Sequence, residues 1–235
     1  MNPEKLAATM IDNAVYVDER NELRSAPDDQ WQARRELAEQ MRAITLAMLT
    51  TDVPAADLRA LAARMQGALA VFENRERIIG RAAHRDRYMR QHGVKPDLLY
   101  ELSPAMGFSN PVAMPMHTWS ENGRTHAEVT PDWVFEGPLE HLHGGVIASL
   151  FDQVLGTTQH LTGGGGMTGT LSIRYLKPVP LNKKLHFVAE VKRTDDRKRF
   201  ILGELWVEDI LCATSEGVFI APRELKPQAG IGNSA

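Results

Sequence analysis

The sequence predicts an α+β fold in which an antiparallel sheet packs around a single helix, preceded by a helical extension. Three observations lead to this prediction. Apolar side chains recur at helical spacing up to about residue 95, six later segments read as strands, and one strongly apolar helix at about 145–160 lies between the second and third strand. The order β-β-α-β-β-β-β contains no βαβ alternation and no repeat, which argues against a Rossmann-type sheet or a solenoid.

Residues 1–95 are expected to form the helical extension, built around an αα-hairpin. One apolar stripe runs through residues 37–48, and a second follows the helix-start signal at 51–54. The loop between them is short, so the two helices should lie antiparallel. A shorter helix with a polar connection is expected within the first thirty residues. The two stripes consist of Leu37, Met41, Ile44 and Met48, and of Leu58, Leu61, Met65, Leu69 and Phe72.

Six arginines lie between residues 75 and 90, against only two carboxylates, Glu76 and Asp86. Arg77, Arg81 and Arg85 are spaced four residues apart, which places them on one side of a helix. Two interpretations remain open. The run forms an anion site, for example for a nucleotide phosphate, or it is a solvated helix face or an inter-subunit salt-bridge surface.

Residues 96–114 are rich in proline, glycine and asparagine, and are expected to be an extended connection. The sheet domain is expected at 115–223, followed by a flexible C-terminal tail at 224–235. Its first two strands flank Asn122-Gly123, a strong hairpin signal. The strands are predicted at 117–120, 125–130, 168–177, 185–192, 200–207 and 211–220.

Composition excludes several classes of protein. The formal net charge is −3, from 27 basic and 30 acidic residues, which argues against nucleic acid as the main partner. The single cysteine, Cys212, can form neither an internal disulfide nor a cysteine metal cage. His141 and His143 lack a nearby carboxylate or cysteine to complete a metal set, so no metal is expected. No apolar run is long enough to span a membrane and no signal peptide is evident, so we expect a cytoplasmic protein.

One carboxylate stands out in the predicted helix. From residue 144 to residue 173, Asp152 is the only carboxylate or permanently charged side chain. The helix around it is apolar on nearly all sides, which indicates that protein encloses it. An ionised carboxylate buried there costs several kcal/mol unless it is hydrogen-bonded. Asp152 therefore either lies at the rim or bonds to neighbouring hydroxyls, or it is held beside a water or ligand as a base or nucleophile.

The start of this helix is the second candidate site. Gly144 and Gly145 follow His143, and leave the first backbone N–H groups uncovered at the positive end of the helix dipole. Such a terminus can polarise a carbonyl oxygen. Gly145 and Asp152 are about 10 Å apart along the axis, at 1.5 Å per residue. One acyl carbonyl cannot touch both within a chain, which predicts a two-fold dimer with composite sites.

These segments resemble the hot-dog fold thioesterases. The likeness is carried by His143 to Ala148, by Asp152, and by the stretches Gly164 to Thr168 and Leu171 to Leu181. More closely, they are similar to the phenylacetate-pathway type and to the human thioesterase superfamily members that hydrolyse fatty acyl-CoA. The likeness covers roughly residues 112–222. It implies a five- or six-stranded sheet around the central helix, homodimers or dimers of dimers with a continuous sheet, and CoA at the dimer interface.

The resemblance also implies roles for individual residues. Asp152 would be the general base or nucleophile, Gly145 N–H the oxyanion donor, and His143 a support for that turn and for the carbonyl. Thr168 would orient the carboxylate or the water. Two features depart from the family pattern, because His141 creates a His-x-His sequence and the extension has no family role. The residues matching CoA-phosphate positions, which could equally serve only surface solubility, are Arg174, Lys177, Arg197 and Lys198.

The expected function is therefore that of an acyl-CoA thioesterase, a thioester hydrolase of fatty acid metabolism. The expected substrate is a medium- to long-chain fatty acyl-CoA, with no cofactor beyond the CoA of the substrate. Two alternatives remain. One is a non-catalytic acyl-CoA-binding module in which Asp152 is merely buried, and the other is a hot-dog hydratase or dehydratase. All of these functions occur on the same fold, so only the residues of the site can decide between them.

Overall fold

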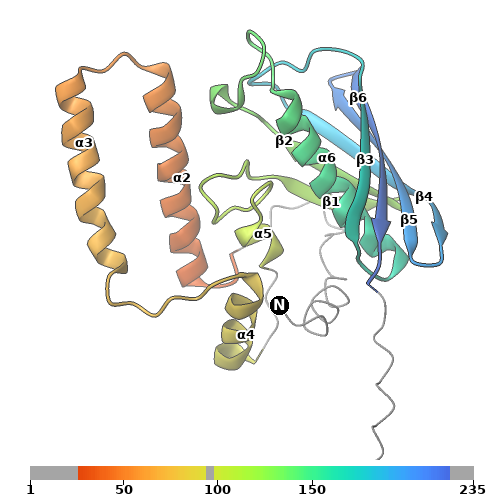
Figure 1. Ribbon diagram of the computed structural model, residues 1–235, viewed down its shortest axis with the longest axis horizontal. Helices are drawn as coiled ribbons and strands as arrows, with labels where there is room; N and C mark the ends of the chain where they lie inside the picture. The colour runs from red at the N-terminus through yellow and green to blue at the C-terminus, as the bar shows by residue number, and fades with distance from the viewer. Residues whose placement is uncertain (1–25, 94–97, 223–235) are drawn as a thin grey trace, which may run out of the picture.

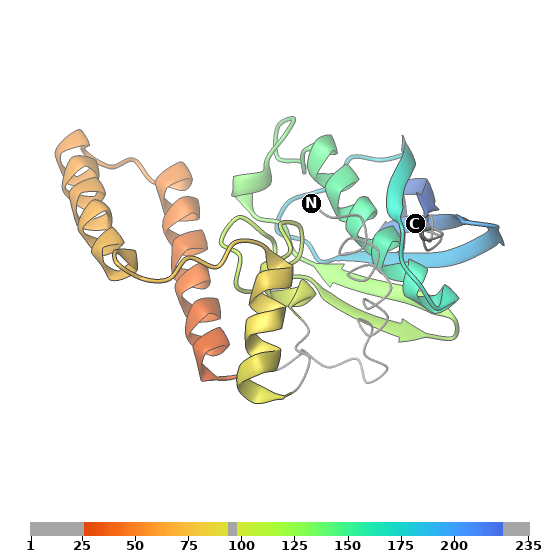
Figure 2. The same cartoon turned by 60° about the horizontal axis from the view of Figure 1, so that its bottom comes forward.

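A computed structural model describes residues 26–93 and 98–222. The short helix expected near the start of the chain falls outside these ranges up to residue 25, as does the tail from 224 onward. Within the described residues the chain forms a sheet wrapped around one helix, with a helical extension beside it (Figures 1 and 2). None of the described helices is both long enough and apolar enough to cross a lipid bilayer.

The sheet has six antiparallel strands, which confirms the predicted α+β class. The order across the sheet is β1-β2-β4-β5-β6-β3, so β1 and β3 are the two edge strands. The strands are β1 (His117–Glu121), β2 (Arg124–Val129), β3 (Met167–Tyr175), β4 (Leu185–Asp195), β5 (Lys198–Val207) and β6 (Ile210–Ile220).

Tight turns join three of the strand pairs. Asn122 and Gly123 both have positive φ, as the predicted hairpin between β1 and β2 requires. Asp196 and Glu208 take the same left-handed conformation in the turns β4–β5 and β5–β6. These turns fix the register within the pairs β1–β2, β4–β5 and β5–β6.

The central helix α6 (Gly144–Thr158) continues into the 3₁₀ helix η3 (Gln159–Thr162) and fills the concave face of the sheet (Figure 2). Phe151 is fully buried and meets Phe187 of β4 edge to face, with ring centroids 5.2 Å apart. Leu155 lies over Gly203 and Gly217, where an added Cβ would come within 2.6 and 2.9 Å of its methyl groups. The helix therefore sits as close to the sheet as it does because these two positions have no side chain.

The extension begins with α2 (Asp29–Thr50) and α3 (Ala55–Ala68), which form a hairpin at one side of the molecule (Figure 1). Helix α2 packs against the 3₁₀ helix η2 (Trp133–Phe135) of the sheet domain. Helix α3 lies farther out and has no buried residue, and the 3₁₀ helix η1 (Leu69–Phe72) continues it. The two predicted apolar stripes are therefore mostly solvent-exposed in a single chain.

A small cluster holds the rest of the extension against α2. Trp31 of α2 packs with Tyr88 of α4 (Arg81–His92) and with Leu98, and the Tyr88 hydroxyl donates a hydrogen bond to the Pro27 carbonyl at 3.0 Å. Residues 96–114, expected to be extended, include the four-residue helix α5 (Leu99–Leu102). The reason is a buried ion pair. The fully buried carboxylate of Glu101, in α5, accepts hydrogen bonds from the guanidinium of Arg35 in α2.

Candidate active site

Asp152 lies half-buried on α6 and accepts a hydrogen bond from the hydroxyl of Thr168, with 2.7 Å between Oγ1 and Oδ1. Within the described residues Asp152 forms no ion pair. The carboxylate is therefore held by one neutral donor and keeps its other oxygen available. This places it at the rim of the apolar helix, bonded to a hydroxyl, as one interpretation of the sequence expects, and leaves it able to accept a proton from a bound water.

A β-bulge explains why Thr168 faces the helix. The pairing of β3 with β6 shifts register between Thr168 and Thr170, so Gly169 is the extra residue. In an unbroken strand, Thr168 and Leu171 would point to opposite faces because side chains alternate. The bulge turns Thr168 onto the same face as Leu171, which packs on the core. A Cβ at residue 169 would approach the Ile220 side chain to 2.9 Å, so glycine also suits this position sterically.

His143 is the N-cap of α6 and satisfies three of its first N–H groups. The Gly145 N–H donates to His143 Nδ1 at 2.9 Å, and the N–H groups of Val146 and Ile147 donate to the His143 carbonyl. Gly144 N–H has no acceptor among the described residues. This end of the helix is exposed in a single chain, so an external carbonyl oxygen can approach it.

The edge strand β3 connects the two ends of the site. Near its start Thr168 bonds to Asp152, and at its last residue the Tyr175 hydroxyl donates to the Gly144 carbonyl at 2.9 Å. These two strand residues are seven apart, or about 20 Å at 3.3 Å per residue. Along α6, Gly145 and Asp152 are separated by about 10 Å. The carboxylate and the helix N-terminus of one chain therefore do not converge on one bond.

The four residues expected to hold CoA phosphates fall into two pairs. Lys198 lies level with Ile220 and so with Met167 at the start of β3, whereas Arg174 lies level with Thr214 near the other end. Arg174 also faces the side of the sheet away from α6, beside Glu204 and Glu216. The structure thus does not bring the pairs Arg174 with Lys177 and Arg197 with Lys198 together within one chain.

A cavity of about 250 Å³ lies beside Asp152. Its wall is formed by polar side chains of α6 and η3, by the glycines at 165–166, by Thr168 and by Arg81 from the extension. Gln153 of α6 lines it and accepts a hydrogen bond from the buried Ser103 at 2.8 Å. The helical extension therefore contributes directly to the surroundings of the carboxylate.

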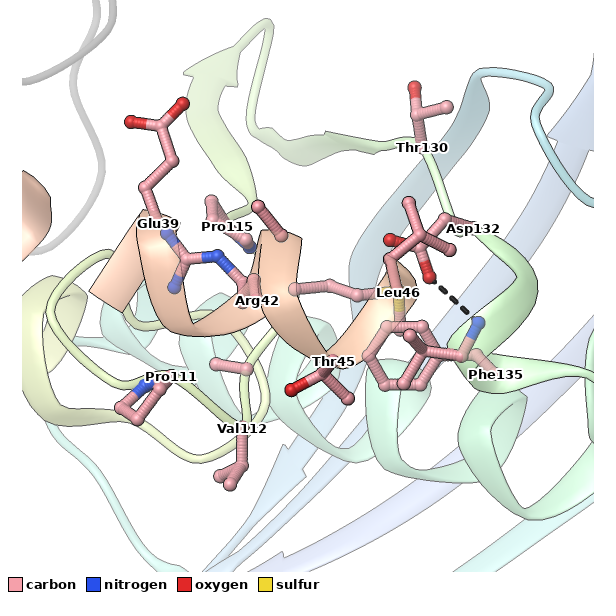
Figure 3. A pocket seen from close by; sticks show the side chains of 14 residues that line it. Glu39, Arg42, Thr45, Leu46, Pro111, Val112, Pro115, Thr130, Asp132 and Phe135 are labelled. Carbon is pink, nitrogen blue, oxygen red and sulfur yellow. Dashed lines mark hydrogen bonds between the residues drawn. The ribbon is translucent and has the colours of Figure 1, made fainter. Parts of the chain in front are cut away.

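A second cavity, of about 400 Å³, separates α2 from the sheet domain (Figure 3). Leu46, Val112 and Phe135 give it a largely apolar lining. Arg42 at its edge donates hydrogen bonds to the carbonyls of Phe108 and Asn110, which hold α2 in place. Neither Asp152 nor Gly145 lines this cavity.

Sequence reasoning did not find three residues near the site. Tyr175 was part of the matched strand but carried no assigned role, Gln153 was read as part of the apolar helix, and Arg81 was one of six similar arginines. The glycine at 169 within a strand was a signal for the bulge. No local signal marks Arg81, because its position depends on packing between residues far apart in the chain.

Comparison with known proteins gives the family. Residues 139–213 match the family described as the thioesterase superfamily. This match lies within the sheet domain, which is therefore similar to the hot-dog thioesterase superfamily. The chain is 28% identical over 92 residues to acyl-coenzyme A thioesterase THEM5 of Homo sapiens, covering 38% of this chain and 37% of that one. It is 34% identical over 70 residues to acyl-coenzyme A thioesterase THEM4 of Xenopus laevis, covering 30% and 32%.

The matched regions span only about a third of the length of these two curated relatives. The hot-dog thioesterase domain also resembles the crystal structure of a thioesterase superfamily protein, with a TM-score of 0.66 and 28% identity. That match covers 80% of this chain and 94% of the other. Residues 96–235 make up 140 of the 235 residues, so the match extends into the helical extension.

Proposed function

We propose that this protein hydrolyses acyl-CoA thioesters in sites shared between two copies of the chain. The observation that carries the proposal is the arrangement along β3, where Asp152 is bonded to one end of an edge strand and the N-terminus of α6 is bonded to the other. Edge strands offer unpaired backbone groups to a second strand. Met167 and Tyr175 of β3 are 55% and 52% exposed, and a second copy would cover them.

Two-fold symmetry then assembles the site. If β3 pairs with its own copy in an antiparallel manner, the Tyr175 end of one strand lies against the Thr168 end of the other. The N-terminus of α6 from one protomer thereby approaches Asp152 of its partner. The same operation brings Arg174 and Lys177 toward the end where the partner's strands carry the other basic pair, and thus gathers positive charge suited to CoA phosphates.

The chemistry uses these groups in turn. Asp152 accepts a proton from water as the water oxygen bonds to the thioester carbonyl carbon. The carbonyl oxygen becomes an oxyanion, which backbone N–H groups at the start of the partner's α6 stabilise. Gly145 N–H is the donor that the resemblance implies, although in a single chain it donates to His143 Nδ1; Gly144 N–H beside it has no acceptor among the described residues. The C–S bond then breaks, releasing the carboxylic acid and the CoA thiolate, which takes up the proton.

Direct attack by Asp152 is the second form of this mechanism. The carboxylate would attack the thioester carbonyl carbon and expel the CoA thiolate, forming a mixed anhydride that water then hydrolyses. In a single turnover in ¹⁸O-labelled water, label in the Asp152 side chain demonstrates the anhydride route with water attacking the Asp152 carbonyl carbon; trapping the acylated enzyme with hydroxylamine detects the anhydride when water attacks the acyl carbon. Thr168 serves either form by fixing the orientation of the carboxylate.

The proposal is tested by measuring thiol release from acyl-CoAs of two to eighteen carbons. The Asp152→Asn variant should lose about 10²–10⁴-fold in kcat, the contribution typical of a general base. Asp209→Asn, an exposed turn carboxylate, is the matched control and should retain full activity. Full activity of Asp152→Asn would overturn the mechanism.

Two other results would select the alternatives. Saturable binding of acyl-CoA without thiol release would favour the non-catalytic module. Loss of the enoyl absorbance of an enoyl-CoA would favour a hydratase. The same series of substrates tests the medium- to long-chain preference expected from the resemblance, which stays a prediction.

A further inference from the structure

The side chains that line the cavity beside Asp152 indicate which kind of acyl group it can accept. This inference rests on the proposed function, since it takes Asp152 as the group that acts on the thioester. A cavity receiving a fatty acyl chain is expected to be mainly apolar. Here the lining combines the apolar Met167 and Phe219 with several polar side chains, namely Gln153, Thr157, Gln159 and Thr168. At about 250 Å³ the space is also smaller than the 300–1,000 Å³ typical of pockets for drug-sized ligands.

Arg81 supplies a cation to this cavity from outside the hot-dog domain. It is the first residue of α4, directly after Gly80, whose positive φ of 90° turns the chain into the helix. The Arg81 side chain is exposed and forms no hydrogen bond or ion pair with any described residue, unlike Arg87, which pairs with Glu76 at 2.6 Å. Its guanidinium donors are therefore available to an anion in the cavity.

A buried polar group lies in the same wall. Gln159 is 2% exposed, and its Nε2 donates to the carbonyls of Gly156 and Gly166 at 3.2 and 3.4 Å. Its buried Oε1 accepts no hydrogen bond from the described residues. A buried amide oxygen without a donor keeps this wall polar, which disfavours an apolar acyl chain.

A second arginine lies next to η3, although it is not among the residues that line the cavity. Arg199 of β5 donates to Thr162 at 2.7 Å through Nε, while its Nη1 is buried without a described partner. His160, which lines the cavity, is kept neutral at pH 7 because burial, and secondarily Arg199, lowers its pKa to about 4. The charged side chains that line the cavity are therefore Arg81 and Asp152, set among neutral hydrogen-bonding groups.

We propose that the acyl group of the substrate is short and carries a carboxylate at its far end, and that Arg81 selects it by pairing with that carboxylate. The substrate class is then an ω-carboxyacyl thioester, in contrast to a fatty acyl-CoA. Arg81 acts on specificity and takes no part in the bond-breaking step, which remains with Asp152. This proposal corresponds to the first interpretation of the arginine run, an anion site. It places that site at Arg81, with a carboxylate as the anion.

The test compares glutaryl-CoA with pentanoyl-CoA, two five-carbon acyl groups that differ in the terminal carboxylate. The wild-type protein should hydrolyse glutaryl-CoA with a kcat/KM at least about tenfold higher, as expected for a charge-assisted hydrogen bond. Arg81→Gln should remove most of that ratio, and Arg81→Glu should invert it. Arg90→Gln, an exposed arginine on the same helix that does not line the cavity, should leave the ratio unchanged.

Three results would overturn the inference. A wild-type preference for pentanoyl-CoA or palmitoyl-CoA would show that the cavity accepts apolar acyl groups. An equal loss with both five-carbon substrates in Arg81→Gln would place the guanidinium on the CoA part. Retention of the glutaryl preference in Arg81→Gln would show that another group recognises the carboxylate.

A failure of the proposed function gives a different signature. In that case the wild-type protein hydrolyses none of the thioesters. Calorimetric binding of glutaryl-CoA and pentanoyl-CoA then decides the assignment of Arg81 separately. Tighter binding of glutaryl-CoA that Arg81→Gln abolishes supports it, and equal binding of the two ligands refutes it.

Discussion

The hydroxyl of Thr168 and the carboxylate of Asp152 are 2.7 Å apart, although sixteen residues separate them in the chain. This bond orients the carboxylate that we assign to catalysis. Replacing Thr168 by valine keeps the shape of the side chain and removes the donor, so kcat should fall about tenfold, the worth of one hydrogen bond to a charged group. Thr168→Ser should retain most of the activity. Equal losses in both variants would mean that the methyl group matters and the bond does not.

The composite site predicts complementation between two inactive variants. Asp152→Asn removes the base, and Gly145→Pro removes one backbone N–H in the first helical turn, where proline is tolerated. Each variant alone should be nearly inactive. Dissociating and reassociating an equal mixture should restore about a quarter of the wild-type activity, because half the dimers are mixed and each of these has one intact site. Light scattering gives the oligomeric state, and no recovery in verified mixed dimers would place both groups in one chain.

Two glycines set the distance between α6 and the sheet. Gly203→Ala and Gly217→Ala each force a methyl group against Leu155, within 2.6 and 2.9 Å, so each should lower the free energy of unfolding by about 1–3 kcal/mol. Gly67→Ala in α3 is the control. Nothing lies within 4 Å of the added Cβ there, so that change should stabilise the helix by up to about 1 kcal/mol. Urea unfolding measures all three, and unchanged midpoints in the sheet variants would contradict this packing.

The ion pair of Arg35 and Glu101 holds α2 to the segment that follows α4. Glu101 is 1% exposed and also accepts a hydrogen bond from the Ser109 hydroxyl. Arg35→Met leaves this carboxylate buried without its cation and should destabilise the protein by about 3 kcal/mol. Adding Glu101→Leu should recover much of that loss. A double variant no more stable than the single variant would show that the pair contributes mainly through packing.

Stability should depend on pH through His160. Its pKa is about 4 in the folded protein and near 6.5 when unfolded, because burial disfavours the charged ring. Between these values the unfolded chain binds the extra proton, so the free energy of unfolding falls as the pH drops from 6.5 to 4 and is unaffected above 7. His160→Gln should flatten part of this decrease. His84 and His126, whose pKa values burial also lowers, should account for some of the remainder. An identical pH dependence in the variant would contradict the assignment.

The sheet domain could be predicted well from the sequence because its signals are local. The alternation of apolar residues, the Asn122-Gly123 turn and the apolar helix each depend on neighbours within a few positions. The predicted helix at 145–160 corresponds to α6 and the first residues of η3, and every predicted strand has a counterpart within a few residues. Asp152 was singled out because a charge inside an apolar helix is conspicuous in the sequence itself.

The surroundings of Asp152 could not be predicted in the same way. Arg81 reaches the cavity only because its helix, α4, is held in place by Tyr88. That side chain packs on Trp31, nearly sixty residues earlier in the chain. The bonds from Arg35 to Glu101 and from Ser103 to Gln153 likewise join distant segments. Helical periodicity predicted the two helices of the outer hairpin, but an apolar stripe indicates a face to be covered and does not say what covers it. In a single chain, α3 leaves that face in solvent.

The cluster of Trp31, Tyr88 and Leu98 attaches α4 to the protein independently of the sheet. On the proposed assignment, the residues that select the substrate are therefore separate from those that act on the thioester. The residues to which we assign thioester cleavage belong to the sheet and its central helix, whereas one wall of the cavity includes Arg81 from a segment with its own small core. Substitutions in residues 81–92 can therefore alter which substrate is accepted without disturbing the strand pairing or the carboxylate. On the proposed assignment, the extension is the part of the protein in which selectivity can change while the groups assigned to the reaction keep their places.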